Sequence, residues 1–288
     1  SLARPQVART RLEQVAPGRT RSGQFVPVDR HRPAGTVGAV TAPARRISFP
    51  GGGGDLLAAR LDLPAGPPRA FALFAHCFTC SADLAALRRL ASGLTERGIA
   101  VLRFDLTGLG SSEGDFANTD LSSNVDDLVA AAEWLREHHR APQLLVGHSL
   151  GGAAVVLAAS RLPEVRAVAT IGAPADTEHT LRWFADDLDT IEAEGRAVVD
   201  LAGRSFTIGA QLVSDLRRHV VTDAVATLDA ALLVMHSPVD EVVAFEHAEQ
   251  LYAAATQPKS IVPLDGADHL LGRAVDAEFA AGVIAAWT

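Results

Sequence analysis

The 288-residue sequence has only two cysteines, Cys77 and Cys80, and no long apolar run. Two cysteines three residues apart do not make the disulfide framework of a small secreted protein. A membrane span needs about 18–20 consecutive apolar residues, so we expect none. The first residues also lack the apolar core of a signal peptide, and we therefore expect a cytoplasmic location.

Basic residues are outnumbered, which argues against nucleic acid as a general partner. The sequence contains 26 Lys and Arg and 34 Asp and Glu, which gives a formal net charge of −8. Residues 1–46 differ, because they contain nine arginines and five prolines against Glu13 and Asp29. We expect residues 1–44 to form a flexible basic extension, with docking on an acidic surface as the alternative.

The remaining residues, 45–288, predict one domain with a large core, since 48% of the sequence is hydrophobic. Short apolar runs at 70–75 and 100–104 alternate with helical patterns at 82–97 and 121–138. This alternation predicts an α/β fold, with a mostly parallel central sheet and helices on both faces. From 176 to 229 the alternation lapses, and we expect a helical insertion that serves as a lid.

The lead-in to this domain predicts an antiparallel pair, Arg45–Phe49 and Leu56–Leu63. Four consecutive glycines, Gly51 to Gly54, join the two segments. They lack the Lys-Ser/Thr pair and the helix start of a phosphate-binding loop, so they predict a hairpin turn instead.

The most informative motif is Gly147-His148-Ser149-Leu150-Gly151, between an apolar run and a helical stretch of small residues. A serine flanked by glycines two positions away on either side is typical of a nucleophile elbow. That turn lifts the hydroxyl above the sheet, and a side chain at either glycine would crowd the strand–helix junction. Ser149 is therefore the candidate nucleophile.

A nucleophilic serine needs a base and an acid that orients the base. Asp240 follows the strand-like segment Ala231–His236, and His269 follows the strand-like segment Ser260–Leu264. Ser149, Asp240 and His269 thus stand in the order expected for this architecture, each just after a predicted strand. Asp176, after an earlier strand, is the rival acid.

Three further segments extend the pattern, and with them the chain resembles the α/β-hydrolase superfamily from about Arg45 to Trp287. They are Phe74 to Ser81, Phe104 to Gly114 and Ala169 to Asp176. They are similar to a bacterial subgroup whose members occur alone or fused to OsmC-type domains. No OsmC activity is carried over. The resemblance implies esterase-type serine hydrolysis without a cofactor or a metal.

The resemblance also implies an oxyanion hole made by backbone amides. One donor is the Leu150 amide, and the other lies in the loop after Ala75, where Phe78 is the candidate. Cys77 stands where many hydrolases have glycine. His76, Trp183 and Phe206 are candidate substrate contacts. For His76 we favour the alternative, a buried and hydrogen-bonded structural residue. Trp183 and Phe206 are equally explained as packing within the insertion.

Cys77-Phe78-Thr79-Cys80 precedes a helical pattern, and a Cys-x-x-Cys at a helix start can cycle as a disulfide. The alternatives are catalytic thiol chemistry, an incidental redox-sensitive pair, and small residues packed behind the oxyanion loop. We favour the last of these, because the chain already has a complete set of candidate hydrolase residues in Ser149, Asp240 and His269.

The sequence therefore predicts hydrolysis of a small-molecule carboxylic ester with a short to medium acyl chain through an acyl-enzyme. The same residues would serve an amidase, a thioesterase or an acyltransferase. A hydrolase-fold protein that binds a small ligand with negligible turnover is the alternative outside enzymes. Dehalogenation is disfavoured, because it needs a carboxylate in place of Ser149.

Overall fold

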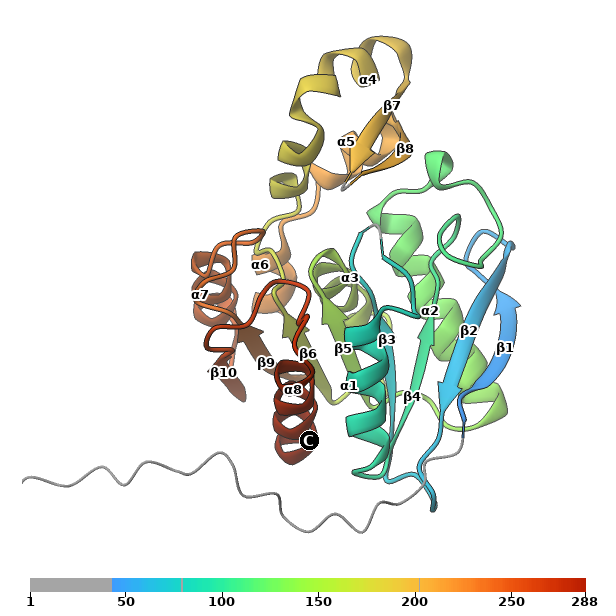
Figure 1. The fold of residues 1–288 in the computed structure, drawn as a ribbon, viewed down its shortest axis with the longest axis vertical. Coiled ribbons are helices and arrows are strands. Elements are labelled where there is room, and N and C mark those ends of the chain that lie inside the picture. Colours follow the sequence, from blue (N-terminus) through green and yellow to red (C-terminus); the bar gives the residue numbers. More distant parts are fainter. Residues whose placement is uncertain (1–42, 79, 202) are drawn as a thin grey trace, which may run out of the picture. The chain divides into compact units, whose positions relative to one another are not determined.

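A computed structural model of the protein describes residues 43–78, 80–201 and 203–288 (Figure 1). The expected basic extension lies outside the described residues, apart from its last two positions. In the part of the chain that is described, no helix has the length and hydropathy needed to cross a bilayer.

The core is an eight-stranded sheet with the order β1-β2-β4-β3-β5-β6-β9-β10. The antiparallel lead-in is confirmed, because β1 pairs with β2 and β2 with β4 in opposite directions, and the other pairs are parallel. Its strands are β1 (Arg45–Pro50), β2 (Leu56–Asp62), β3 (Ala70–Ala75), β4 (Ile99–Phe104), β5 (Leu144–His148), β6 (Ala167–Ile171), β9 (Ala231–His236) and β10 (Lys259–Pro263).

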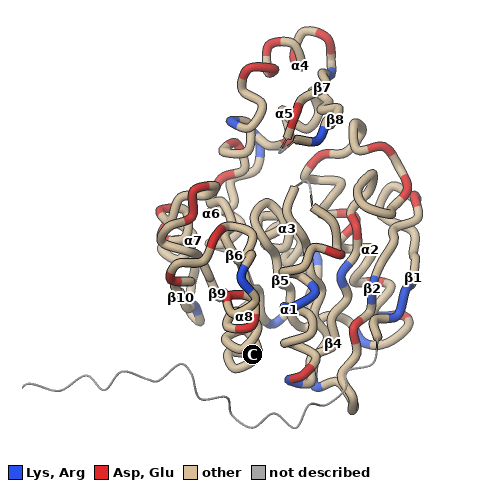
Figure 2. Tube along the Cα trace, viewed as in Figure 1, with Lys and Arg blue, Asp and Glu red and all other residues tan. Residues whose placement is uncertain are grey.

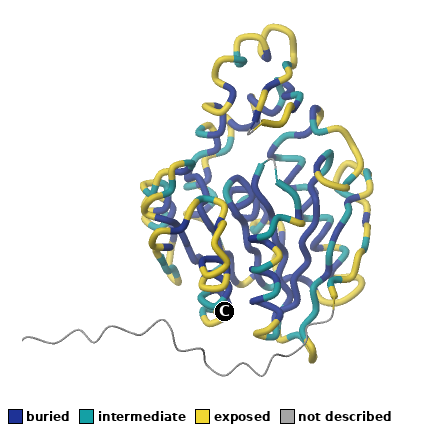
Figure 3. Tube along the Cα trace, viewed as in Figure 1, coloured by how far each residue is buried: buried dark blue, intermediate teal, exposed yellow. Residues whose placement is uncertain are grey.

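Both faces of the sheet are covered by helices, and the central strands are buried (Figures 1 and 3). In β3, Leu73 packs into the cluster on one face, while its neighbour Phe74 packs into the cluster on the other. This is the two-residue period of a strand, with both faces apolar as parallel sheets require.

One face carries α1 (Ala85–Thr95) and α8 (Ala274–Trp287), which share an apolar cluster. The other face carries α2 (Leu121–His138), α3 (Leu150–Ala159), α6 (Val221–Ala226) and α7 (Glu246–Ala254). The α2 helix spans the residues that its sequence predicts. It begins with a capping box, in which Asp120 and Ser123 satisfy each other's backbone amides.

The segment between β6 and β9 is not purely helical, which corrects the expectation of a helical insertion. It holds η2 (Glu178–Asp187), α4 (Leu188–Glu194), the antiparallel pair β7 (Arg196–Leu201) and β8 (Arg204–Gly209), and α5 (Ala210–Leu216). A bridge between Asp176 and Val220 closes its base. The next helix, α6, contacts α3 and α7 and belongs to the core, so we define the insertion as residues 176–220.

Asp215 connects this insertion to the core. Its carboxylate is 1% exposed and accepts hydrogen bonds from the Ser122 backbone amide (2.8 Å) and hydroxyl (2.9 Å). Ser122 lies in the first turn of α2, where backbone amides have no partner within the helix. His219 adds a contact of 3.3 Å to the same carboxylate. The insertion is thus attached to the sheet domain by a buried polar cluster.

We expect Asp215→Ala to lower the free energy of unfolding by about 2–4 kcal/mol, because it leaves buried donors without an acceptor. Denaturant unfolding followed by circular dichroism measures this change. Asp223→Ala, on the exposed side of α6, is the matched control and should change the value by less than about 0.5 kcal/mol. Equal effects of the two substitutions would contradict the role given to Asp215.

Candidate active site

Ser149 lies in the sharp turn between β5 and α3, in a backbone conformation that non-glycine residues rarely adopt. Its φ is 55° and its ψ is −128°. The turn is held on both sides, because the Ser149 amide donates to the Ile171 carbonyl (2.9 Å) and the Gly152 amide donates to the Ser149 carbonyl (2.8 Å). The side chain stays partly exposed at the carboxyl edge of the sheet.

The two glycines of the motif are required by close backbone contacts. A Cβ atom at Gly147 would lie 2.3 Å from the carbonyl oxygen of Gly151. A Cβ atom at Gly151 would lie 2.3 Å from the carbonyl oxygen of His76, in the loop after β3. The second contact shows that the start of α3 packs directly on that loop.

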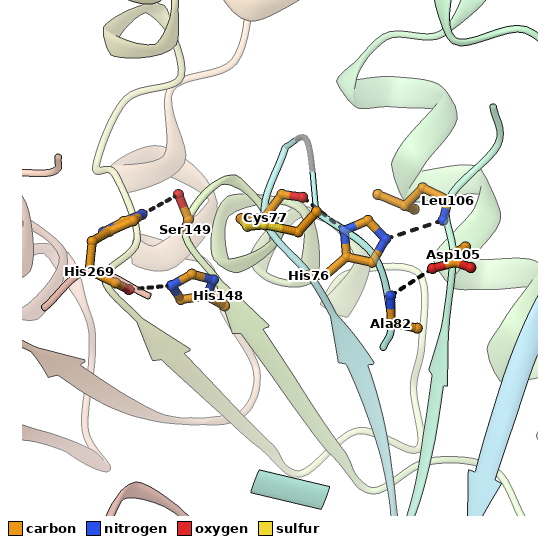
Figure 4. The surroundings of a disulfide bond; sticks show 9 residues. His76, Cys77, Ala82, Asp105, Leu106, His148, Ser149 and His269 are labelled. Atoms are coloured by element: carbon orange, nitrogen blue, oxygen red, sulfur yellow. Dashed lines mark hydrogen bonds between the residues drawn. A yellow bond between two sulfur atoms is a disulfide. The ribbon is translucent and has the colours of Figure 1, made fainter. Parts of the chain in front are cut away.

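A continuous hydrogen-bonded chain joins Ser149, His269 and Asp240. The His269 Nε2 atom is 3.0 Å from the Ser149 hydroxyl, and its Nδ1 atom is 2.8 Å from the Asp240 carboxylate. A carboxylate only accepts hydrogen bonds, so Nδ1 of the neutral ring holds the proton. The bare Nε2 atom then accepts the hydrogen bond of the serine hydroxyl (Figure 4).

Asp240 is 2% exposed and is stabilised in its ionised form. Burial alone would raise its pKa. The hydrogen bonds from His269 and from the amides of Val243 (2.9 Å) and Val242 (2.8 Å) outweigh this and hold the pKa below its ordinary value. The side chain of the rival acid Asp176 is 48% exposed, and one of its oxygens accepts a hydrogen bond from the His179 amide. The structure therefore brings Asp240, and not Asp176, to His269.

His148, the residue before the serine, reaches the loop that holds His269. Its Nε2 atom donates to the His269 carbonyl at 2.7 Å, as Figure 4 shows. Among the described residues, its Nδ1 atom has no hydrogen-bond partner. Burial, together with the neighbouring His269, lowers the pKa of His148 to about 3. The ring therefore stays neutral and serves as a donor that fixes the backbone of His269.

His76 is a buried structural residue, which is the role favoured from the sequence, and it is not among the residues that line the cavity and could contact substrate. Its ring is 1% exposed and bridges the Cys77 carbonyl (2.8 Å) and the Leu106 amide (3.4 Å). Burial lowers its pKa. His76 thus ties the loop after β3 to the loop after β4, and only its backbone contacts the elbow.

A cavity of about 520 Å³ opens above Ser149 and His269. The loop after β3 contributes Cys77, Phe78 and Cys80 to its wall, and the insertion contributes Trp183 and Leu201. Trp183 therefore lies where a substrate contact is expected.

Phe206 does not line the cavity, so of the two roles that the sequence leaves open for it, substrate contact and packing, the structure supports packing. It is 9% exposed, and its ring contacts that of Phe116, which in turn contacts Phe78, with centroid distances of 5.3 and 5.5 Å. This row of aromatic rings joins β8 to the loop that holds the candidate oxyanion donor.

Two features of the site differ from what the sequence patterns favour. The structure joins Cys77 and Cys80 in a disulfide, with a Cα–Cα distance of 5.4 Å, although packed small residues are the favoured expectation. The β7–β8 pair is the other, and its signal is weak: β-branched residues at Val198, Val199, Thr207 and Ile208 flank a turn at Gly203 with a φ of 76°.

Comparisons with known proteins agree with this geometry. Residues 66–201 match the family model described as serine aminopeptidase S33. The crystal structure of the esterase domain from a Rhodothermus marinus protein is 45% identical in sequence. The similarity covers 85% of this chain and 98% of that domain, with a TM-score of 0.69. The chain belongs to the α/β-hydrolase family.

The chain is also similar, at lower identity, to curated proteins with different names. YfhR of Salmonella typhimurium, an uncharacterized protein, is 26% identical over 71% of this chain and 66% of its own length. The mitochondrial palmitoyl-protein thioesterase ABHD10 of Rattus norvegicus is 23% identical over 62% of each chain. The chain thus spans about two thirds of the length of these curated relatives.

The low pKa of His148 predicts a specific pH dependence of stability. Below pH ~6.5 the unfolded chain binds a proton at this position, whereas the folded protein does not until the pH nears 3. The free energy of unfolding therefore decreases as the pH is lowered through this range. His148→Gln removes this titration. We expect wild type to lose on the order of 2 kcal/mol more than the variant between pH 7 and pH 5. Denaturant unfolding at both values measures the difference.

Ser160→Ala, at the exposed end of α3, is the control, because it neither adds nor removes a titrating group in this range, and it should lose stability in parallel with wild type. Parallel curves for wild type and His148→Gln would show that His148 is protonated in the folded state.

Proposed function

We propose that this α/β hydrolase cleaves carboxylic esters through a covalent acyl-enzyme. The observation that supports this most strongly is the hydrogen-bonded chain from Asp240 through His269 to the partly exposed Ser149, at the floor of a cavity. A serine with a base and an oriented acid is the arrangement that activates a hydroxyl for attack on a carbonyl.

In the first half of the reaction, the Ser149 Oγ atom attacks the ester carbonyl while His269 Nε2 takes the hydroxyl proton. Asp240 holds the ring in the required tautomer and stabilises its charged form. The amide of Leu150, at the start of α3, and the amide of Phe78 are the proposed donors to the oxyanion. One such donor contributes about 3 kcal/mol to transition-state stabilisation.

In the second half, the tetrahedral intermediate collapses and the alcohol leaves with the proton that His269 held. A water molecule then enters, His269 takes its proton, and the resulting hydroxide attacks the acyl carbonyl. Collapse of the second intermediate releases the carboxylic acid and returns the proton to Ser149. No step of this sequence requires a metal or a cofactor.

The cavity supports a small, neutral acyl group. Its volume of about 520 Å³ lies within the range of roughly 300–1,000 Å³ that is usual for small-molecule sites. Phe78, Leu84, Trp183 and Leu270 give it apolar walls close to Ser149. We therefore propose short to medium acyl chains, which fit within this volume and bury their apolar surface against such walls.

Thioester hydrolysis is the second candidate, because one relative is named as a palmitoyl-protein thioesterase. The same three side chains serve both reactions, since both pass through an acyl-enzyme. A panel of butyryl ester, butyryl thioester and butyryl anilide separates ester, thioester and amide preference, because the acyl group stays constant. A ranking of kcat/KM with the ester first supports the proposal.

We expect Ser149→Ala to lower kcat for p-nitrophenyl butyrate by about 10³-fold or more, because it removes the nucleophile. Labelling by a fluorophosphonate probe should disappear with it. Ser160→Ala, at the exposed end of the same helix, is the matched control and should keep both properties. Undiminished turnover in Ser149→Ala would overturn the proposal.

The acid role is tested by a pair of isosteric substitutions. We expect Asp240→Asn to lower kcat by about 10⁴-fold, because the amide stabilises the wrong tautomer of His269. Asp176→Asn should keep kcat within about threefold of wild type, since Asp176 does not contact His269. Steady-state kinetics at pH 7.5 compares the two variants, and the opposite ranking would transfer the role to Asp176.

A further inference from the structure

The Cys77–Cys80 disulfide closes a short loop around Phe78, immediately after β3. Both cysteines line the cavity that contains Ser149, as Figure 4 shows for Cys77 beside the elbow. Phe78 holds the second proposed oxyanion donor on its backbone. The disulfide therefore constrains the segment whose position decides whether that amide faces the reacting carbonyl.

Both ends of this segment are held by other contacts. At one end, the buried His76 ring binds the Cys77 carbonyl and the Leu106 amide. At the other end, the Ala82 amide donates to the buried Asp105 carboxylate at 2.6 Å. Between these ends, the disulfide is the covalent restraint, beside the hydrogen bond from the Cys80 amide to the Cys77 carbonyl (3.1 Å) and the contact of the Phe78 ring with Phe116. Opening the disulfide would leave those two weaker contacts to hold the backbone around Phe78, while the sheet and α1 stay in place.

The disulfide is accessible to a reductant through the cavity. Cys77 is 7% exposed, whereas Cys80 is half-buried and lies nearer to solvent. Thiol–disulfide exchange begins with attack of a thiolate on one sulfur, and accessible disulfides exchange most readily. The Cys80 sulfur is therefore the site of attack, and Cys77 is the leaving thiolate.

We propose that Cys77 and Cys80 form a reversible redox site whose oxidised form supports hydrolysis and whose reduction by a dithiol lowers the turnover number. This inference rests on the proposed function. In the reaction, one thiolate of the dithiol bonds to Cys80 Sγ as the Cys77–Cys80 bond breaks. The second thiolate then displaces Cys80. The protein gains two electrons and two protons, and the dithiol becomes a disulfide.

The effect should fall on kcat, because an oxyanion donor acts on charge that develops in the transition state. After equilibration with dithiothreitol we expect kcat for p-nitrophenyl butyrate to fall about tenfold or more, with KM changed by less than about threefold. Oxidised dithiothreitol should restore the original rate. Alkylation of free thiols followed by intact-protein mass spectrometry gives the redox state of each sample.

The double variant Cys77→Ser/Cys80→Ser tests the assignment to this bond. Its kcat should be low and should respond to neither reagent. Near-UV circular dichroism of the reduced wild type should retain its tertiary signal, which separates a local change from unfolding. A lost tertiary signal would attribute the decrease to unfolding and overturn the inference.

The two proposals fail in different ways. If reduced protein with two titrated thiols keeps its full kcat and its fluorophosphonate labelling, the redox inference is wrong and the esterase proposal stands. If oxidised protein neither turns over any member of the ester, thioester and anilide panel nor reacts with the probe, the proposed function is wrong and the redox inference falls with it.

Discussion

The turn at Ser149 forms because two backbone segments approach each other with no side chain between them. A non-glycine residue at positive φ costs of the order of 1–3 kcal/mol, so the surrounding contacts must hold it. Gly147 and Gly151 allow those contacts, since a Cβ atom at either would meet a carbonyl oxygen at 2.3 Å. The contact of Gly151 with the His76 carbonyl also determines where the loop after β3 runs. One packing constraint thus places the proposed nucleophile and the loop with the proposed oxyanion donor together.

His269, the proposed base, is positioned by a second set of backbone contacts. The loop after β10 contains Leu271 with a φ of 52° and Gly266 with a φ of 69°, so its conformation also depends on its surroundings. His148 meets it from the elbow side through the His269 carbonyl, and the Leu264 amide donates to the His236 carbonyl at 2.8 Å. The residue next to the nucleophile therefore also orients the base, which couples the two groups through one strand end.

The sequence predicts those features of the structure that depend on local patterns, such as strand boundaries and the order of motifs. The β9 strand begins and ends at the expected residues, and the structure brings Ser149, Asp240 and His269 within hydrogen-bond distance as their order suggests. Contacts between residues far apart in the sequence cannot be predicted from such local patterns. The His148 bond spans 121 positions, and its motif position alone indicates nothing about the partner. The β7–β8 pair also depends on a contact between distant residues, because Phe206 in β8 packs against Phe116, which is far away in the chain.

The acidic composition of the insertion contributes little to the cavity itself. Residues 176–200, all of which the structure describes, contain eight acidic side chains, and Asp200 is the one that lines the cavity. Asp176 precedes η2, and the others lie along η2 and α4 (Figure 2). Most of them are exposed to solvent. Exposed charges are screened over about 8 Å at physiological ionic strength. Apolar side chains such as Trp183 and Leu201 line the cavity beside Asp200 and Arg204. Because an apolar wall cannot solvate a charge, this lining supports the proposal of a neutral acyl group.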